Sequence, residues 1–123
     1  MIQSLKKIMS YLSIMPRLNS LSNQVNESKI LAAKALIKQI QMNGVYDNIH
    51  DVEFQVFSQF GDDGIIQYLI HNVKVENQVF IEFGVGNYVE SNTRLLLINN
   101  NWKGLVIDGF QDYIDYIQIG NII

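Results

Sequence analysis

Two short apolar segments, each followed by a turn and a helical pattern, constrain the fold of this chain more than any other feature. The segment QVFIEF spans residues 78–83, and the segment GLVIDG spans residues 104–109. A nearly continuous apolar run of this length is typical of a strand that is buried on both faces. A helical pattern over residues 91–100 separates the two segments, and another helix begins at residue 111. Strands that alternate with helices predict an α/β fold with a parallel sheet.

Helical patterns also precede the first predicted strand. Residues 1–15 are predicted to form a short amphipathic helix, and residues 20–42 carry apolar side chains near a 3.6-residue period. Ser20 or Ser22 is the candidate cap of this second helix, and Gly44 is its predicted stop. A helix of about ten residues follows at residues 65–73, capped by Asp62 or Asp63. We therefore expect an N-terminal helical segment over residues 1–50 and a Rossmann-like domain over residues 51–123.

Composition and charge limit the partners of the chain. The 123 residues carry a net charge of -3, and their nine Lys and Arg residues are scattered, so nucleic acid is not an expected partner. No apolar run reaches the roughly 20 residues that span a bilayer, so stable membrane insertion is not expected. The chain has no cysteine, which fits a cytoplasmic location. His50 and His71 lack partner ligands at metal spacing, and no metal site is predicted.

A carboxylate and two glycines follow the first predicted strand. Glu82, Gly84 and Gly86 lie where ligands bind in parallel α/β sheets, beyond the carboxyl ends of the strands. Glycine allows a sharp turn and a close approach of a ligand to the backbone. Asp108 ends the second strand, and a carboxylate there can accept both hydroxyls of a ribose. These residues predict a nucleoside site; the alternative is a buried strand that ends in a turn, with Asp108 as a helix cap.

The spacing of the glycines bears on which nucleoside is bound. The third glycine of a dinucleotide fingerprint is replaced by Val89, and no phosphate-binding loop with a G-K-[ST] ending occurs. Glu82 is unfavourable beside a pyrophosphate but suits a ligand that carries an ammonium and a sulfonium. S-adenosylmethionine is such a ligand and is the predicted cofactor. A nicotinamide-binding oxidoreductase is the weaker alternative.

The segments FSQFGDDGIIQYLI and FIEFGVGNYVESNTRLLLINNNWKGLVIDG resemble a known family. Their residues and spacing are similar to those of FkbM-type and related class I S-adenosylmethionine-dependent methyltransferases, which are often found among surface-polysaccharide and glycan-modification genes. The likeness covers about residues 57–109. It implies a Rossmann-like sheet of the class I methyltransferase type. It also implies methyl transfer to a hydroxyl of a sugar or another small acceptor.

The resemblance also implies roles for single residues. Glu82, Gly84 and Gly86 would form the first cofactor loop, with Glu82 oriented toward the amino-acid part of the cofactor, and Asp108 would bind the ribose hydroxyls. The residues that would line the loop and cap the next helix are Asn87, Ser91, Asn92 and Thr93, and capping by itself explains Asn92 and Thr93 equally well. Asp62 and Asp63 would border the methionine end or cap their helix. Trp102 is predicted to be a packing residue.

This chain departs from the family in the number of its strands. The class I methyltransferase sheet has seven strands, whereas this sequence supplies two, and its last residues could open a third. We therefore expect a frame truncated after the second or third strand, with half a cofactor site, no assignable catalytic base, and little or no turnover by the isolated chain. The alternative is a non-catalytic remnant or interaction module. It would associate through the helix at residues 20–43 and through an uncovered sheet edge.

Overall fold

The computed structural model describes the backbone of residues 2–119, and the side chains of residue 9 and residues 11–119. The chain divides into two units, one ending at Ala32 and the other beginning at Ala33. The first unit is the N-terminal part of one long helix, α1 (Ile2–Asn43). The second unit holds the last turns of α1 and all the remaining helices and strands.

Helix α1 is continuous, which corrects the predicted break between two N-terminal helices. Pro16 lies inside the helix, so Ser20 and Ser22 do not cap a new one. Proline has a φ that suits a helix but lacks an N–H, so the helix loses the hydrogen bond to the carbonyl of Leu12 and continues. Gly44, with φ 78°, directly follows the helix, as predicted. No helix among the described residues combines the length and the apolar character needed to cross a bilayer.

A 3₁₀ turn, η1 (Ile49–Val52), leads to helix α2 (Asp62–Asn72). The predicted capping of α2 by an aspartate is wrong, because Gly61 occupies the cap position and the N–H of Asp63 donates to the hydroxyl of Ser58 at 3.0 Å. The carboxylate of Asp63 instead accepts hydrogen bonds from the backbone N–H groups of residues 56–58, at 2.7 to 2.8 Å. A Cβ at Gly64 would lie 1.9 Å from the carbonyl oxygen of Val52, so only glycine allows α2 to approach η1 this closely.

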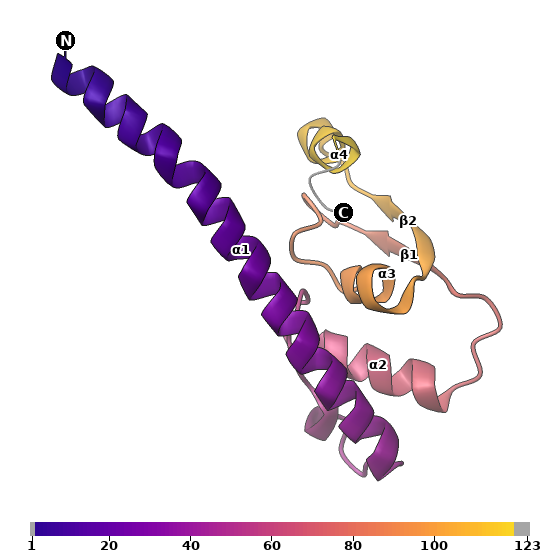
Figure 1. Ribbon diagram of the computed structural model, residues 1–123. Helices are drawn as coiled ribbons and strands as arrows, with labels where there is room; N and C mark the ends of the chain where they lie inside the picture. Colours follow the sequence, from indigo (N-terminus) through magenta and orange to yellow (C-terminus); the bar gives the residue numbers. More distant parts are fainter. Residues whose placement is uncertain (1, 120–123) are drawn as a thin grey trace. The chain divides into compact units, whose positions relative to one another are not determined.

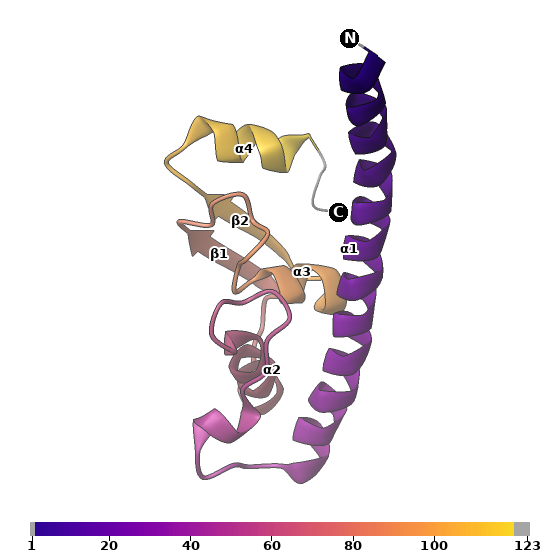
Figure 2. The same cartoon turned by 90° about the vertical axis from the view of Figure 1, so that its left-hand side faces the viewer.

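The sheet consists of two parallel strands, β1 (Val79–Phe83) and β2 (Lys103–Ile107). Val79 pairs with Lys103 and Phe83 pairs with Ile107. Helix α3 (Arg94–Asn100) connects the strands, and helix α4 (Gln111–Gln118) follows β2 (Figures 1 and 2). This arrangement confirms the predicted parallel β-α-β unit. Of the residues that could have opened a third strand, 117 and 118 belong to α4, and residues 120–123 lie outside the described part of the chain.

The core of the second unit lies on one face of this sheet. Phe80, Leu96 and Trp102 form a buried cluster, which confirms the packing role predicted for Trp102, and the half-buried side chains packed against it are Ile66, Ile70, Leu97 and Val106. A Cβ at Gly104 would lie 2.3 Å from the ring of Phe80. The glycine therefore makes room on β2 for a large aromatic side chain of β1.

The opposite face of the sheet is open among the described residues. Ile81, Phe83 and Leu105 are 61%, 72% and 55% exposed, and Val79 and Ile107 lie on the same face and are also exposed. The predicted burial of both faces is therefore wrong for this part of the chain. The physical reason is that α2 and α3 contribute their apolar side chains to the Phe80 face. The apolar sequence of the strands thus provides a second packing surface that no described helix occupies.

Candidate functional site

The loop between β1 and α3 contains the two glycines that the sequence singles out. Gly84, Gly86 and Tyr88 have φ values of 70°, 56° and 62°, in the left-handed region that favours glycine. Cβ atoms built on Gly84 and Gly86 would have no heavy atom within 4 Å. The backbone conformation therefore favours glycine at both positions, and the backbone there faces open space. The N–H of Gly84 donates to the carbonyl of Ile107 at 2.8 Å, which holds the loop to the end of β2.

Asp108 forms a second connection between this loop and the end of β2. Its Oδ2 accepts a hydrogen bond from the N–H of Gly86 at 2.7 Å, and its Oδ1 accepts one from the N–H of Phe110 at 2.9 Å. A carboxylate has about four lone-pair sites, so each oxygen can accept a further hydrogen bond. Asp108 is half-buried. It therefore fixes the loop and can also accept hydrogen bonds from a bound ligand.

Glu82 anchors the start of α3. Its Oε2 accepts hydrogen bonds from the hydroxyls of Ser91 and Thr93, both at 2.5 Å. The same oxygen accepts the N–H of Thr93 at 3.0 Å. Its Oε1 accepts the N–H of Asn92 at 3.0 Å. Thr93 occupies the cap position of α3, but its side chain makes no capping hydrogen bond. The predicted capping by the side chains of Ser91, Asn92 or Thr93 is therefore wrong. The strand instead supplies a carboxylate that binds the N–H groups of Asn92 and Thr93, directly before the helix.

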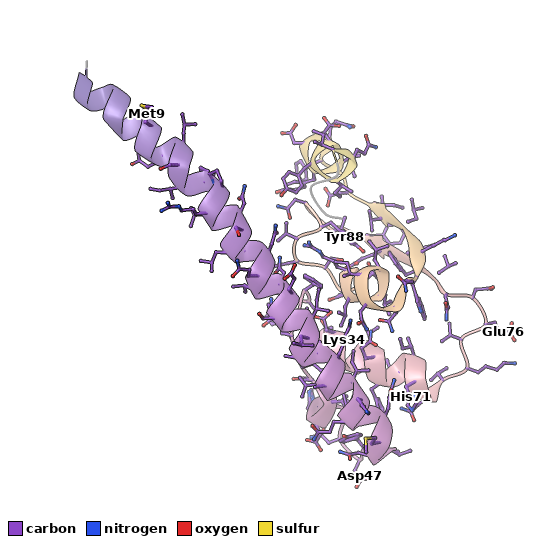
Figure 3. The ribbon with its side chains drawn as sticks, in the orientation of Figure 1. Met9, Lys34, Asp47, His71, Glu76 and Tyr88 are labelled. Atoms are coloured by element: carbon purple, nitrogen blue, oxygen red, sulfur yellow. The ribbon has the colours of Figure 1, made fainter. Side chains whose placement is uncertain are left out.

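The surroundings of Glu82 favour its ionised form. Burial raises the pKa of this carboxyl, but the hydrogen bonds from Ser91 and Thr93 and from the backbone of Asn92 and Thr93 outweigh burial, so the pKa is lowered. Tyr88, labelled in Figure 3, extends this network, with its hydroxyl 3.0 Å from the Oγ1 of Thr93. Because the Thr93 hydroxyl donates to Glu82, Tyr88 must be the donor in this pair. Burial raises the pKa of Tyr88, so this donor keeps its proton.

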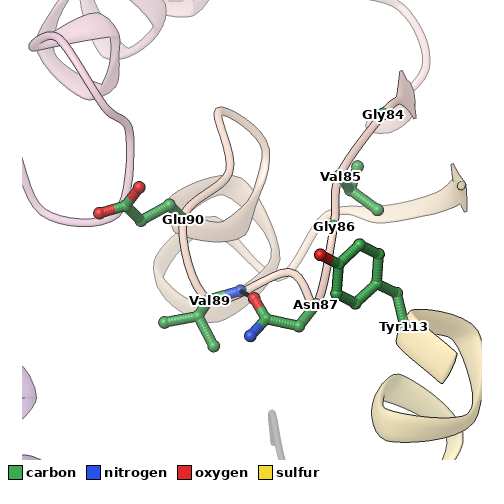
Figure 4. A pocket seen from close by; sticks show the side chains of 7 residues that line it. All are labelled: Gly84, Val85, Gly86, Asn87, Val89, Glu90 and Tyr113. Carbon is green, nitrogen blue, oxygen red and sulfur yellow. Dashed lines mark hydrogen bonds between the residues drawn. The ribbon is translucent and has the colours of Figure 1, made fainter. Parts of the chain in front are cut away.

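A cavity of about 470 Å³ lies over the glycine loop and is lined by Gly84, Val85, Gly86, Asn87, Val89, Glu90 and Tyr113. Figure 4 shows the side chain of Tyr113 extending from α4 toward the segment that contains Gly86 and Asn87. Asn87 shapes the loop through its Oδ1, which accepts the N–H of Val89 at 3.1 Å. Gly84, Gly86 and Asn87 were predicted site residues. Tyr113 was missed because no motif marks it, although an aromatic residue early in the helix after β2 is a usable signal.

The other predicted site residues lie outside the lining of this cavity. Glu82, Asn92 and Thr93 form the separate hydrogen-bond network at the start of α3. Asp62 lies in the first turn of α2. Asp108 is joined to the cavity through Gly86. The structure thus brings together Gly84, Gly86, Asn87 and Asp108, while the role implied for Glu82 toward the cofactor stays a prediction.

The segment FSQFGDDGIIQYLI, which precedes β1, also supports the loop between β1 and α3. Asp63 is 1% exposed and also accepts the hydroxyl of Ser58 at 2.8 Å. The carbonyl of Phe57 accepts the N–H of Ser91 at 3.0 Å. Asp63 therefore holds residues 56–58 in a conformation that presents the Phe57 carbonyl to the segment before α3.

Arg94 is a structural residue that the sequence reading missed. Its side chain is buried, and its guanidinium lies over the ring of Phe57, 4.5 Å from the centroid. One of its nitrogens donates to the carbonyls of Tyr88 at 3.2 Å and Val89 at 2.8 Å. Burial lowers the pKa of Arg94. This cation holds the outer part of the loop through two backbone carbonyls, so the loop geometry is fixed from the side of α3 as well as from β2.

The polar groups around the cavity include amides and carboxylates. Among the residues that the structure describes, no group of three or more His, Asp and Glu side chains could hold a metal ion. The cavity instead offers an open glycine backbone and the amide of Asn87, with the carboxylate of Asp108 beside it. Comparisons with protein-family models, with curated proteins and with solved structures gave no significant match.

Proposed function

We propose that this chain binds S-adenosylmethionine and forms the cofactor-binding part of a methyltransferase. The observation that carries the proposal is the position of Asp108, which accepts the N–H of Gly86 at 2.7 Å beside an open cavity. A ribose whose two hydroxyls donate to Asp108 would use the lone pairs that the backbone leaves available. The nucleoside would then lie over the part of the loop where the two glycines leave space.

The charges around the cavity support S-adenosylmethionine over a dinucleotide. Glu90 lines the cavity, Asp108 lies beside it, and no Lys or Arg is among the lining residues. A pyrophosphate would meet two carboxylates with no cation to offset them, whereas a sulfonium and an ammonium would be attracted. The loop also lacks the third glycine of the dinucleotide fingerprint, since Val89 is in its place.

The mechanism of such an enzyme is mainly one of positioning. The cofactor supplies an electrophilic methyl group on a sulfonium, and this chain's loop and Asp108 would hold the nucleoside so that the methyl faces an acceptor. A sugar hydroxyl or another small hydroxyl acceptor is the substrate class that the family resemblance implies. None of the residues in the cavity is assigned as the base that would remove the proton of the acceptor.

Calorimetric titration of the chain with S-adenosylhomocysteine, the product form of the cofactor, tests the proposal. We expect saturable binding that Asp108→Asn weakens by about tenfold or more, because the amide replaces one acceptor oxygen with a donor. The matched control is Asp112→Asn, an exposed acid in the first turn of α4, which should bind normally. No binding, equal loss in both variants, or displacement of the ligand by NAD would contradict the proposal.

An interaction module is the second candidate, and the open face of the sheet favours it. Ile81, Phe83 and Leu105 present adjacent exposed apolar side chains on the paired strands, and such surfaces commonly bind other chains. Under this alternative the chain would sediment as a concentration-dependent assembly that Ile81→Asp disrupts, and it would not bind S-adenosylhomocysteine. Ligand binding that Ile81→Asp leaves unchanged would instead favour the methyltransferase.

A further inference from the structure

Helix α1 carries a mainly apolar seam with the spacing of a coiled coil. Alternating steps of three and four residues connect its members, which are Tyr11, Ile14, Leu18, Leu21, Val25, Ser28, Ala32 and Ala35. All are exposed, and the large ones from Tyr11 to Val25 are between 45% and 60% exposed. A 3.5-residue average is the repeat that two supercoiled helices bury against each other, with the seam residues at the a and d positions.

The seam is distinct from the face that α1 uses inside its own chain. Ala33, Ile37 and Ile40 are the buried residues at the end of the helix. At 100° per residue, Ala32 and Ala35 lie roughly 135° around the helix from them. Pro16 falls at the outer f position, where its ring would not enter a coiled-coil interface. The helix can therefore pack in the second unit and present the seam to a partner at the same time.

The residues that flank the seam favour a second copy of this chain, in parallel and in register. In that arrangement each g position faces the e position five residues later in the partner helix. Leu31 of each helix (71% exposed) would then pack against Leu36 of the other helix (41% exposed). Arg17 would face Ser22, and Gln24 would face Lys29, so no like charges meet along residues 11–36.

The same pattern argues against a bilayer as the occupant. A helix that lies on a membrane needs a broad apolar face, whereas the polar residues Ser22, Gln24 and Lys29 directly adjoin this seam and keep it narrow. Within the described part of the first unit, α1 is the single element, so nothing there covers the seam, and helices gain most of their stability from packing an apolar face. We propose that residues 11–35 of α1 form a parallel two-stranded coiled coil with a second copy of this chain.

Sedimentation equilibrium of the full chain tests the assembly. We expect a mass of twice 14.1 kDa at micromolar concentrations. The variant Leu21→Glu with Val25→Glu should weaken the dimer by about 100-fold or more, because it buries carboxylates in the seam. The control is Leu12→Glu, which changes an exposed apolar residue (68%) of the same helix at an outer b position and should leave the mass unchanged. The fluorescence of Trp102 verifies that the second unit remains folded in both variants.

A monomeric wild-type chain, or an equal effect of the seam and control variants, would overturn the proposal. The same is true if the wild-type chain binds vesicles of phosphatidylcholine and phosphatidylserine as a monomer.

The absence of native cysteine allows the orientation to be tested directly. Ser28→Cys places a thiol at a d position, where parallel helices bring equivalent residues close enough for a disulfide. Asn23→Cys places one at the outer f position of the same helix. Under mild oxidation we expect a covalent dimer from Ser28→Cys and none from Asn23→Cys. Equal cross-linking of the two variants, or none in either, would refute the parallel register.

Discussion

Replacing Glu82 by glutamine removes the negative charge that holds the start of α3. The carboxylate accepts hydrogen bonds from Ser91, Asn92 and Thr93, and every group that it contacts is a donor. A glutamine side chain has one acceptor oxygen and one NH₂ group. If its oxygen takes the place of Oε2, its NH₂ must face the N–H of Asn92, so that one hydrogen bond is lost and two donors oppose each other.

The expected loss of stability follows from these contacts. Hydrogen bonds to a charged group contribute about 1.5–3 kcal/mol and neutral ones about 0.5–1.5 kcal/mol. One bond is lost and the others become neutral, but Glu82 is only half-buried, so solvent screens part of the effect. We expect a decrease of about 2 kcal/mol in the free energy of unfolding.

Urea unfolding followed by the fluorescence of Trp102 measures this change, because that residue is 8% exposed and lies in the core of the second unit. Glu90→Gln is the matched control, since it removes the same charge from an exposed residue of the same loop. A difference between the two variants of less than about 0.5 kcal/mol, the usual range of surface substitutions, would refute the reasoning.

The pH dependence provides an independent check on Glu82. Its pKa in the folded chain lies below the ordinary value of 4.5, so its ionisation contributes stability that is fully present above that value. This stability is lost as the pH falls through the lower folded pKa. The difference in free energy of unfolding between the wild-type chain and Glu82→Gln should therefore shrink as the pH falls below 4.5. A difference that stays constant over this range would contradict the assigned network.

Two glycine substitutions test the packing and the loop. Gly104→Ala should destabilise the second unit by about 1–3 kcal/mol in the same urea assay, because its Cβ would lie 2.3 Å from the ring of Phe80; an unchanged midpoint would show that the ring can move aside. Gly86→Ala should destabilise by about 1 kcal/mol through its positive φ, whereas Gly109→Ala, with open space and no positive φ, should be neutral. Equal effects of Gly86→Ala and Gly109→Ala would contradict this account of the loop.

The sequence predicted the parallel β-α-β unit because that architecture depends on local patterns. The alternation of apolar runs with helical patterns and glycines specifies strands and helices without knowledge of distant partners. The stop of α1 at Gly44 and the left-handed Asn101 at the end of α3 are equally local features. Pro16 shows the limit of such rules, because proline lowers the stability of a helix without always ending it.

The site was harder to predict because its hydrogen bonds join distant residues. Aspartate commonly caps a helix, yet the carboxylate of Asp63 accepts hydrogen bonds from the N–H groups of residues 56–58. The position of Glu82 near the end of β1 suggests an acid that faces a ligand, yet its oxygens contact residues 91–93. Tyr113 enters the cavity from α4. In each case the sequence shows the chemical type of the side chain. The residues that it contacts depend on how segments distant in the sequence come together in the fold.

The loop after β1 is held at several points along its length. Gly84 is bonded to Ile107, Gly86 is bonded to Asp108, and Arg94 binds the carbonyls of Tyr88 and Val89. A loop that is rigid before its ligand arrives loses little conformational entropy on binding, so preorganisation supports affinity. Its outward side chains at Val89 and Glu90 form no part of these anchors, and both line the cavity. The backbone therefore serves as a fixed frame on which selectivity for the proposed ligand can be redesigned by substitution at those two positions.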